Sequence, residues 1–230
     1  MDATDQPADR EARPVSYWVT LAILAGGILL YIVLVTRPGP ELPGDQGPGV
    51  GQRLGYLKLE PLTGDAQAVT AEDLDGRVTL INYWGTWCPP CIQEFPHIVD
   101  LAEKYGDQED FRLYAVSCGS GGVENLDELT EKTEAFLKQR DATLPTYADE
   151  DASSRQAMIA QFKFQMAYPT TMILDRQGIV RGVWMGFDPR SINGMDTMIQ
   201  KLLDESLPSD HAHPHRHPHP HEDVLPTATE

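Results

Sequence analysis

The sequence predicts an α/β domain in which helices flank a mixed central sheet, preceded by one transmembrane helix. Between residues 53 and 206, short apolar runs alternate with segments whose apolar residues recur at helical spacing, as an α/β fold requires. Residues 15–36 form a separate uncharged stretch near the start of the chain. Without its two ends, the 230-residue chain leaves about 150 residues for one domain, which is enough to bury a core.

Residues 15–36 are predicted to be a transmembrane anchor. A helix needs about 20 mostly apolar residues to span a bilayer, and Tyr17, Trp18 and Tyr31 lie toward the ends of this stretch, where aromatic residues suit the membrane interfaces. A cleaved signal peptide is the alternative, but its apolar core would be shorter, about 7–15 residues, and would end in small residues. This stretch ends Val33-Leu34-Val35-Thr36, so we expect an uncleaved anchor.

The flanking charges predict the orientation of the anchor. Arg10 and Arg13 precede it and Arg37 follows it, so the positive-inside rule places residues 1–14 in the cytoplasm. We therefore expect a single-pass protein of the cell (inner) membrane whose large domain, residues 53–206, is periplasmic or otherwise extracytoplasmic. Residues 37–52, RPGPELPGDQGPGVGQ, are rich in proline and glycine and are predicted to be a linker that holds the domain off the membrane.

The first half of the domain is predicted to contain three strands and one long helix. Residues 54–60 and 67–70 are short strand-like runs on either side of the turn Thr63-Gly64-Asp65. Residues 78–83 are expected to be a buried central strand because of their apolar density. A helix follows at residues 89–105, with Pro89 tolerated in the first turn and Pro96 expected to kink the helix.

The second half of the domain is predicted from the same signals. A glycine-rich stretch, Gly119-Ser120-Gly121-Gly122, ends one strand, Arg176-Gln177-Gly178 forms the turn of an antiparallel pair, and Pro189 begins the last helix. The expected strands are 111–117, 146–148, 170–175 and 179–185, and the expected helices are 124–140, 153–162 and 188–206.

The most informative motif is Trp87-Cys88-Pro89-Pro90-Cys91, directly after the predicted central strand. A Cys-x-x-Cys pair that opens a helix places two sulfurs where they form and break one short disulfide, with Cys88 as nucleophile and Cys91 as resolving thiol. Half of a zinc site has the same spacing, but the folded region adds only Cys118 and His97 as further ligands. We therefore interpret the pair as redox-active. Three cysteines in total exclude a disulfide-stapled scaffold.

The two prolines between the cysteines predict the direction of the chemistry. N–H groups of the first helical turn stabilise a thiolate, but Pro89 and Pro90 have none. We expect a Cys88 pKa nearer the thioredoxin value of about 7 than the value of about 3.5 in the oxidant DsbA. A less stabilised thiolate makes the dithiol less favoured and the protein more reducing.

Two segments resemble the TlpA/ResA-like branch of the thioredoxin superfamily. The first runs from Asn82 to Cys91 and continues with Glu94-Phe95-Pro96, and the second is Tyr168 to Asp175 followed by Gly178. The resemblance covers residues 54 to 206. It implies a thioredoxin-like fold with extra N-terminal strands and an inserted helix, and a membrane-anchored thiol–disulfide oxidoreductase.

Helical spacing from Cys91 and the resemblance both point to Glu94 as a third catalytic residue. Thioredoxin uses a buried Asp on the preceding strand, where this chain has Asn82, so Glu94 is expected to take the proton of Cys91. A solvated glutamate on the helix surface is the alternative. The resemblance also implies substrate-binding roles for four residues around the pair. These are Trp87, Pro89, Tyr168 and Pro169.

Further expectations concern the surroundings of the pair. The resemblance implies a cis Tyr168–Pro169 bond packed against the disulfide, with Trp87 and Tyr168 flanking an exposed Cys88 sulfur. Trp84 is expected to be a core residue under the helix. Cys118 is expected to be a buried free thiol that behaves as a small hydrophobe, and a third redox thiol is the alternative.

The C-terminal residues 207–230 are predicted to be a disordered His/Pro-rich tail. Six of the seven histidines alternate with other residues here, which permits weak binding of copper, nickel or zinc; an unstructured tail with incidental metal affinity is the alternative. The candidate ligands are His211, His213, His215, His217, His219 and His221. No other cofactor than the redox-active disulfide is expected. The formal charge of −17 argues against a nucleic-acid partner.

Taken together, these features predict an outward-facing reductant of protein disulfides. The expected partners are substrate proteins with disulfides and a membrane thiol transporter as electron donor, and the resemblance implies substrates of the cytochrome c maturation or copper-site assembly type. The alternative is a copper-binding metallochaperone of the same fold that uses the cysteine pair and the tail. Such relatives carry Cys-x-x-x-Cys and a distal histidine within the domain, which this chain lacks. A peroxidase would use one peroxidatic cysteine without a partner three residues on.

Overall fold

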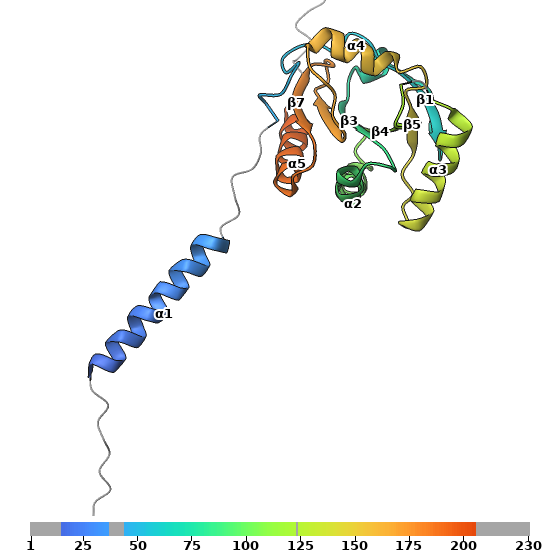
Figure 1. The fold of residues 1–230 in the computed structure, drawn as a ribbon. Coiled ribbons are helices and arrows are strands. Elements are labelled where there is room, and N and C mark those ends of the chain that lie inside the picture. Colours follow the sequence, from blue (N-terminus) through green and yellow to red (C-terminus); the bar gives the residue numbers. More distant parts are fainter. Residues whose placement is uncertain (1–14, 37–43, 123, 206–230) are drawn as a thin grey trace, which may run out of the picture. The chain divides into compact units, whose positions relative to one another are not determined.

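The computed structural model describes residues 15–36, 44–122 and 124–205, and within the first of these ranges the side chains of residues 18–32 (Figure 1). The chain divides into two units, residues 1–40 and 41–230. The first unit contains the helix α1, Val15–Thr36, with the bounds that the sequence predicted. Among the described residues, no helix combines the length and the hydropathy that crossing a membrane requires.

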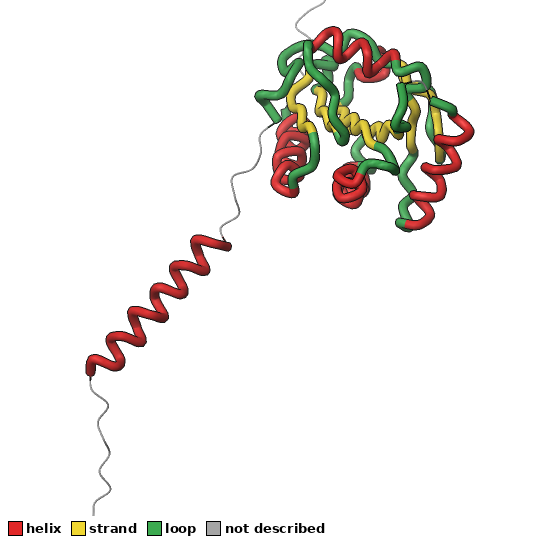
Figure 2. Tube along the Cα trace, viewed as in Figure 1, coloured by secondary structure: helices red, strands yellow, loops and turns green. Residues whose placement is uncertain are grey.

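The second unit is built on one seven-stranded mixed sheet, which curls between layers of helices (Figure 2). The strand order is β2-β1-β5-β4-β3-β6-β7. β3 lies between a parallel neighbour, β4, and an antiparallel neighbour, β6. The strands are β1 Lys58–Thr63, β2 Val69–Thr70, β3 Val78–Trp84, β4 Phe111–Ser117, β5 Thr146–Ala148, β6 Thr170–Leu174 and β7 Val180–Met185.

The central strand β3 carries the core on both faces, and all seven of its residues are buried. Leu80 belongs to the cluster on one face, with residues of α2 (Pro89–Tyr105) and α5 (Pro189–Asp204). Ile81 and Tyr83 belong to the cluster on the other face, with residues of α4 (Ser153–Phe162). This alternation follows from the two-residue period of a strand. Helix α3 (Leu126–Gln139) packs beside α2 through a cluster of aromatic side chains, which comprises Trp84, Phe95 and Phe136.

The predicted order of elements is confirmed, with small shifts at the ends. Four elements, β4, β5, α2 and α4, have the predicted bounds, and β3, β6 and β7 agree with the prediction to within one residue. Helix α3 and the short strand β5 lie between β4 and α4, as predicted. Residues 54–57 precede β1 rather than belonging to it. Glu124 lies outside α3, because Asn125 caps that helix by accepting a hydrogen bond from the Glu128 backbone N–H at 3.2 Å.

The described part of the predicted linker is folded onto the domain. Gly44 O accepts a hydrogen bond from Val183 N at 2.9 Å, and Gly51 N donates to Val180 O at 2.8 Å. A Cβ atom at Gly44 would lie 2.6 Å from the Trp184 ring, so the close approach requires glycine. Residues 44–52 therefore belong to the domain rather than to a free linker. Proline and glycine content alone does not separate a free tether from a segment that lies tightly against a strand.

Candidate active site

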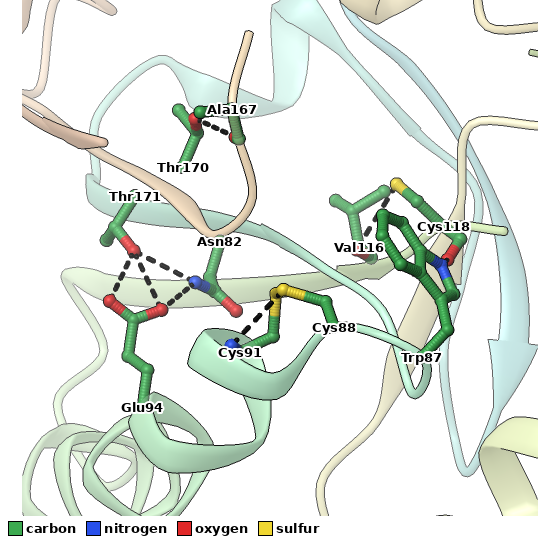
Figure 3. Close-up of a disulfide and its surroundings, with 10 residues drawn as sticks. All are labelled: Asn82, Trp87, Cys88, Cys91, Glu94, Val116, Cys118, Ala167, Thr170 and Thr171. Carbon is green, nitrogen blue, oxygen red and sulfur yellow. Dashed lines mark hydrogen bonds between the residues drawn. A yellow bond between two sulfur atoms is a disulfide. The ribbon is translucent and has the colours of Figure 1, made fainter. Parts of the chain in front are cut away.

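The cysteine pair forms a disulfide at the start of α2, directly after the loop that leaves β3. Cys88 is the N-cap of the helix, with extended backbone angles, and Pro89 and Pro90 occupy its first turn. Because these prolines have no N–H, the first helical donor is Cys91 N, which donates to Cys88 Sγ at 3.3 Å. This is the arrangement that the two prolines predicted (Figure 3).

Both sulfurs are shielded in this oxidised state. Cys88 is 3% exposed and Cys91 is 1% exposed, so the expectation of an exposed Cys88 sulfur is wrong for the disulfide form. The neighbouring Trp87 is 46% exposed and its indole N–H donates to Cys118 O at 2.9 Å. Pro89 is exposed at the helix start. Trp87 and Pro89 are therefore open to solvent in front of two buried sulfurs.

Glu94 lies one helical turn beyond Cys91 and is buried, with 1% of its surface exposed. Its carboxylate accepts a hydrogen bond from the Asn82 side-chain amide at 2.8 Å, and the Thr171 hydroxyl lies 3.5 Å from both carboxylate oxygens. The Asn82 amide also donates to Thr171 Oγ1 at 2.9 Å. Figure 3 shows the three side chains converging to the left of the disulfide, Asn82 from β3, Thr171 from β6 and Glu94 from α2.

The surroundings of Glu94 move its pKa toward neutral pH. Burial raises the pKa of Glu94 to about 7, and the hydrogen bonds from Asn82 and Thr171 oppose this shift only in part. The alternative of a solvated glutamate is wrong, because the side chain lies between the helix and the sheet. Asn82 and Thr171 were not predicted as site residues. The signal was present in Asn82, a polar residue in the otherwise apolar centre of β3.

The Tyr168–Pro169 bond is cis, as the resemblance implied. The Tyr168 ring meets the Trp87 ring edge to face, with the ring centroids 5.5 Å apart. The Tyr168 hydroxyl accepts a hydrogen bond from Arg155 Nη1 at 2.9 Å. Pro169 O accepts a hydrogen bond from Gly186 N at 2.7 Å, which joins this loop to the residue after β7. Arg155 is a third residue that was not predicted from the sequence as part of the site.

Two further expectations about the core are confirmed. Trp84 is 1% exposed and packs against Phe95 under the helix. Cys118 is a free thiol, 1% exposed, whose Sγ contacts Val116 O at 3.7 Å. Burial raises the pKa of the Cys118 thiol to about 12, so it stays protonated and unreactive at neutral pH.

The predicted metal ligands of the tail, His211 to His221, lie outside the described residues, and the tail remains a prediction. Within the described residues, no three His, Cys, Asp or Glu side chains are grouped to hold a metal ion.

Comparison with known proteins supports the redox interpretation. A model of the AhpC/TSA family matches residues 50–183. Thioredoxin-like protein YneN of Bacillus subtilis is 29% identical over 160 residues, which cover 70% of this chain and 79% of that protein. Thiol:disulfide interchange protein DsbE of Pseudomonas aeruginosa is 26% identical over 192 residues, covering 80% and 96% of the two chains.

A third relative and a solved structure complete the comparison. Thiol-disulfide oxidoreductase ResA of Bacillus cereus is 28% identical over 120 residues, covering 50% of this chain and 59% of that protein. The solution structure of a candidate thioredoxin from Neisseria meningitidis matches with a TM-score of 0.52 at 26% identity, covering 72% of this chain and 99% of that one. The resemblance and the thioredoxin-like fold predicted from the two sequence segments are thereby confirmed.

The buried carboxyl predicts how stability depends on pH. Because the folded pKa of Glu94, about 7, lies above its ordinary value of 4.5, the folded state holds a proton that the unfolded state has lost, and stability falls as pH rises between these values. At about 1.4 kcal/mol for each pKa unit, the loss attributable to Glu94 is about 3 kcal/mol. Glu94→Gln is expected to remove this loss. Urea unfolding of both proteins at about pH 4 and about pH 8 measures the difference. Parallel pH profiles for the two proteins would contradict the raised pKa.

Proposed function

Because the chain belongs to the AhpC/TSA family and is a thiol–disulfide oxidoreductase, we propose that it works as a membrane-anchored, extracytoplasmic reductant of protein disulfides. One observation supports a reductant rather than an oxidant. Because Pro89 and Pro90 fill the start of α2, the first backbone N–H of the helix that donates to Cys88 Sγ is that of Cys91. A Cys88 thiolate in this place is weakly stabilised. The reduced form is therefore easily oxidised by a substrate.

The reaction begins with the Cys88 thiolate of the reduced protein. It attacks one sulfur of a substrate disulfide, a Cys88–substrate bond forms, and the second substrate sulfur leaves as a thiolate. Cys91 then attacks Cys88 Sγ, which closes the Cys88–Cys91 disulfide and releases the first substrate sulfur. Two electrons pass from the cysteine pair to the substrate, and a donor must return two electrons for the next cycle.

Glu94 acts in the second of these steps. Cys91 attacks as a thiolate, and a carboxylate with a pKa near 7 accepts its proton at neutral pH without needing a large driving force. The hydrogen bond from Asn82 keeps the carboxylate oriented from the sheet side. Asn82 and Thr171 therefore act through Glu94 as positioning residues.

The membrane part of the proposal rests on residues 15–36, which carry no charged side chain, and on the arginines at both ends of this range. A domain on the outer side cannot draw electrons from cytosolic thioredoxin, so the proposed donor is a membrane thiol transporter. The relatives named DsbE and ResA support a disulfide-bearing substrate protein. Substrates of the cytochrome c maturation or copper-site assembly type are the proposed class.

The reduction potential of the Cys88–Cys91 pair tests the direction. We expect a value near that of thioredoxin, about −270 mV, because the two prolines remove donors from the thiolate. The measurement uses the fragment from residue 41 to residue 206, equilibrated in glutathione or dithiothreitol buffers. A value near that of DsbA, about −120 mV, would show that the protein makes disulfides instead.

The pH profile of the resolving step tests Glu94. Glu94→Gln is expected to slow release of substrate from the mixed disulfide by roughly tenfold to a hundredfold at neutral pH, because a positioned base is lost. Stopped-flow quenching follows the mixed disulfide over a range of pH. The wild-type rate should rise through about pH 7 and the variant rate should not. Identical profiles would remove Glu94 from the mechanism.

Fractionation of cells that express the full chain tests the anchor. We expect the protein to stay with membranes after alkaline carbonate washing, and its domain to be digested by protease added to spheroplasts. Deletion of residues 15–36 should make the domain extractable. Protection of the domain in spheroplasts that digest a known periplasmic control would reverse the proposed orientation.

A further inference from the structure

A guanidinium group is buried behind the loop that carries the cis proline. Arg155, in the first turn of α4, is 4% exposed. Its Nε donates to Asp149 Oδ2 at 3.0 Å, and its Nη2 donates to Glu124 Oε1 at 3.0 Å. Its Nη1 donates to the Tyr168 hydroxyl at 2.9 Å. One side chain thus joins three segments of the chain, at residues 124, 149 and 168.

The ions of this network are almost completely removed from water. The side chains of Asp149 and Glu124 are 0% and 4% exposed. Buried ion pairs add little stability compared with apolar packing, since desolvation opposes their attraction. Their best-attested use is to fix one arrangement of the chain. Asp149 also accepts the backbone N–H groups of Ser154 and Arg155, so the guanidinium itself starts from a fixed position.

Two of these segments, those of Tyr168 and Glu124, support Trp87, the residue before Cys88. Tyr168 contacts the Trp87 ring, and Cys118 O accepts the Trp87 indole N–H. Glu124, on the other arm of the network, accepts the backbone N–H of Gly119 at 3.0 Å. Trp87 is therefore supported on both sides by residues that are connected through Arg155.

A pocket opens between Trp87 and the residues that follow β4. Its volume is about 380 Å³, and its walls include Thr86, Trp87, Gly119, Ser120, Glu124 and Lys132. Trp87, which precedes Cys88 in the chain, forms part of its wall, so the pocket lies beside the cysteine pair. Glu124 in its wall and Tyr168, which contacts Trp87, both accept hydrogen bonds from Arg155.

We propose that Arg155 is a positioning residue for the polypeptide substrate, which fixes Tyr168, Trp87 and the pocket beside Trp87 as one rigid binding surface. This rests on the proposed function. The structure records no contact of Arg155 with Cys88 or Cys91, and Arg155 acts through Tyr168 and Glu124. Loss of the network affects a substrate that occupies the surface more than one that reaches only the sulfurs.

The test compares a protein disulfide with a small one. Arg155→Lys keeps the positive charge between the two carboxylates but cannot reach three segments at once. Tyr168→Phe removes the hydroxyl and leaves the ring, so it tests the same arm without disturbing the buried ions. Tyr56→Phe is the matched control, since it also removes a hydroxyl that contacts α4, at Ser153 Oγ, but outside the network.

The substrates are insulin and hydroxyethyl disulfide, assayed with the reduced full chain. Both test variants are expected to raise KM for insulin at least fivefold with a smaller effect on kcat. Their kcat/KM for insulin, relative to that for the small disulfide, should fall at least fivefold. Tyr56→Phe should behave as the wild type does.

Three results would overturn the inference. One is an equal loss with both substrates in Tyr168→Phe, and another is no change in a folded Tyr168→Phe protein. The third is that the wild-type protein reduces the small disulfide but not insulin. This result would refute the inference without refuting the proposed redox activity. A wild type that reduces neither substrate would instead refute the proposed function, and with it this inference.

Discussion

The carboxyl group of Glu94, held away from water beside the disulfide, is the constraint around which the site is built. It is buried because α2 lies flat against the centre of the sheet, where Leu80 and the residues of α2 and α5 share one apolar cluster. It is not left without partners, because Asn82 and Thr171 are directly opposite each other in the pairing of β3 with β6. A change in that strand register would separate the amide from the hydroxyl and leave the carboxylate unsupported.

The two sulfurs of the pair are controlled by different parts of the fold. The first turn of α2 acts on Cys88, through the donors that Pro89 and Pro90 do not supply. The sheet acts on the Cys91 side, through the buried glutamate one turn further along the helix. In the proposed mechanism, driving force and rate are therefore set by separate parts of the fold. The helix start governs how readily the pair gives up electrons, and the carboxylate governs how fast the intermediate is released.

Local patterns predicted most of the fold. Both ends of α2, β4, β5 and α4 were predictable because apolar periodicity, a proline at the helix start and a glycine-rich stretch each operate over a few residues. The cysteine pair and Glu94 were found for the same reason, since helical spacing alone relates them. The cis bond at Pro169 was expected only from the family resemblance.

What the sequence could not predict depends on contacts between distant segments. The burial of Glu94 depends on Thr171, 77 residues further on. In the sequence, Arg155 looks like an ordinary charged residue on a helix surface. Its burial follows only from the fold, which surrounds it with Glu124, Asp149 and Tyr168. A buried arginine is rare enough that no local pattern favours it.

The segment of residues 44–52 has a consequence for how the domain behaves on its own. β7 is the last strand of the sheet, and its outer side would present unpaired N–H and C=O groups to any other chain. Hydrogen bonds between this side and Gly44, Gly51 and Gln52 occupy several of these groups without adding a further strand. Because residues 44–52 are irregular and rich in glycine, another chain cannot easily pair with them as a further strand. The stretch before the first strand thus serves as a guard against edge-to-edge aggregation.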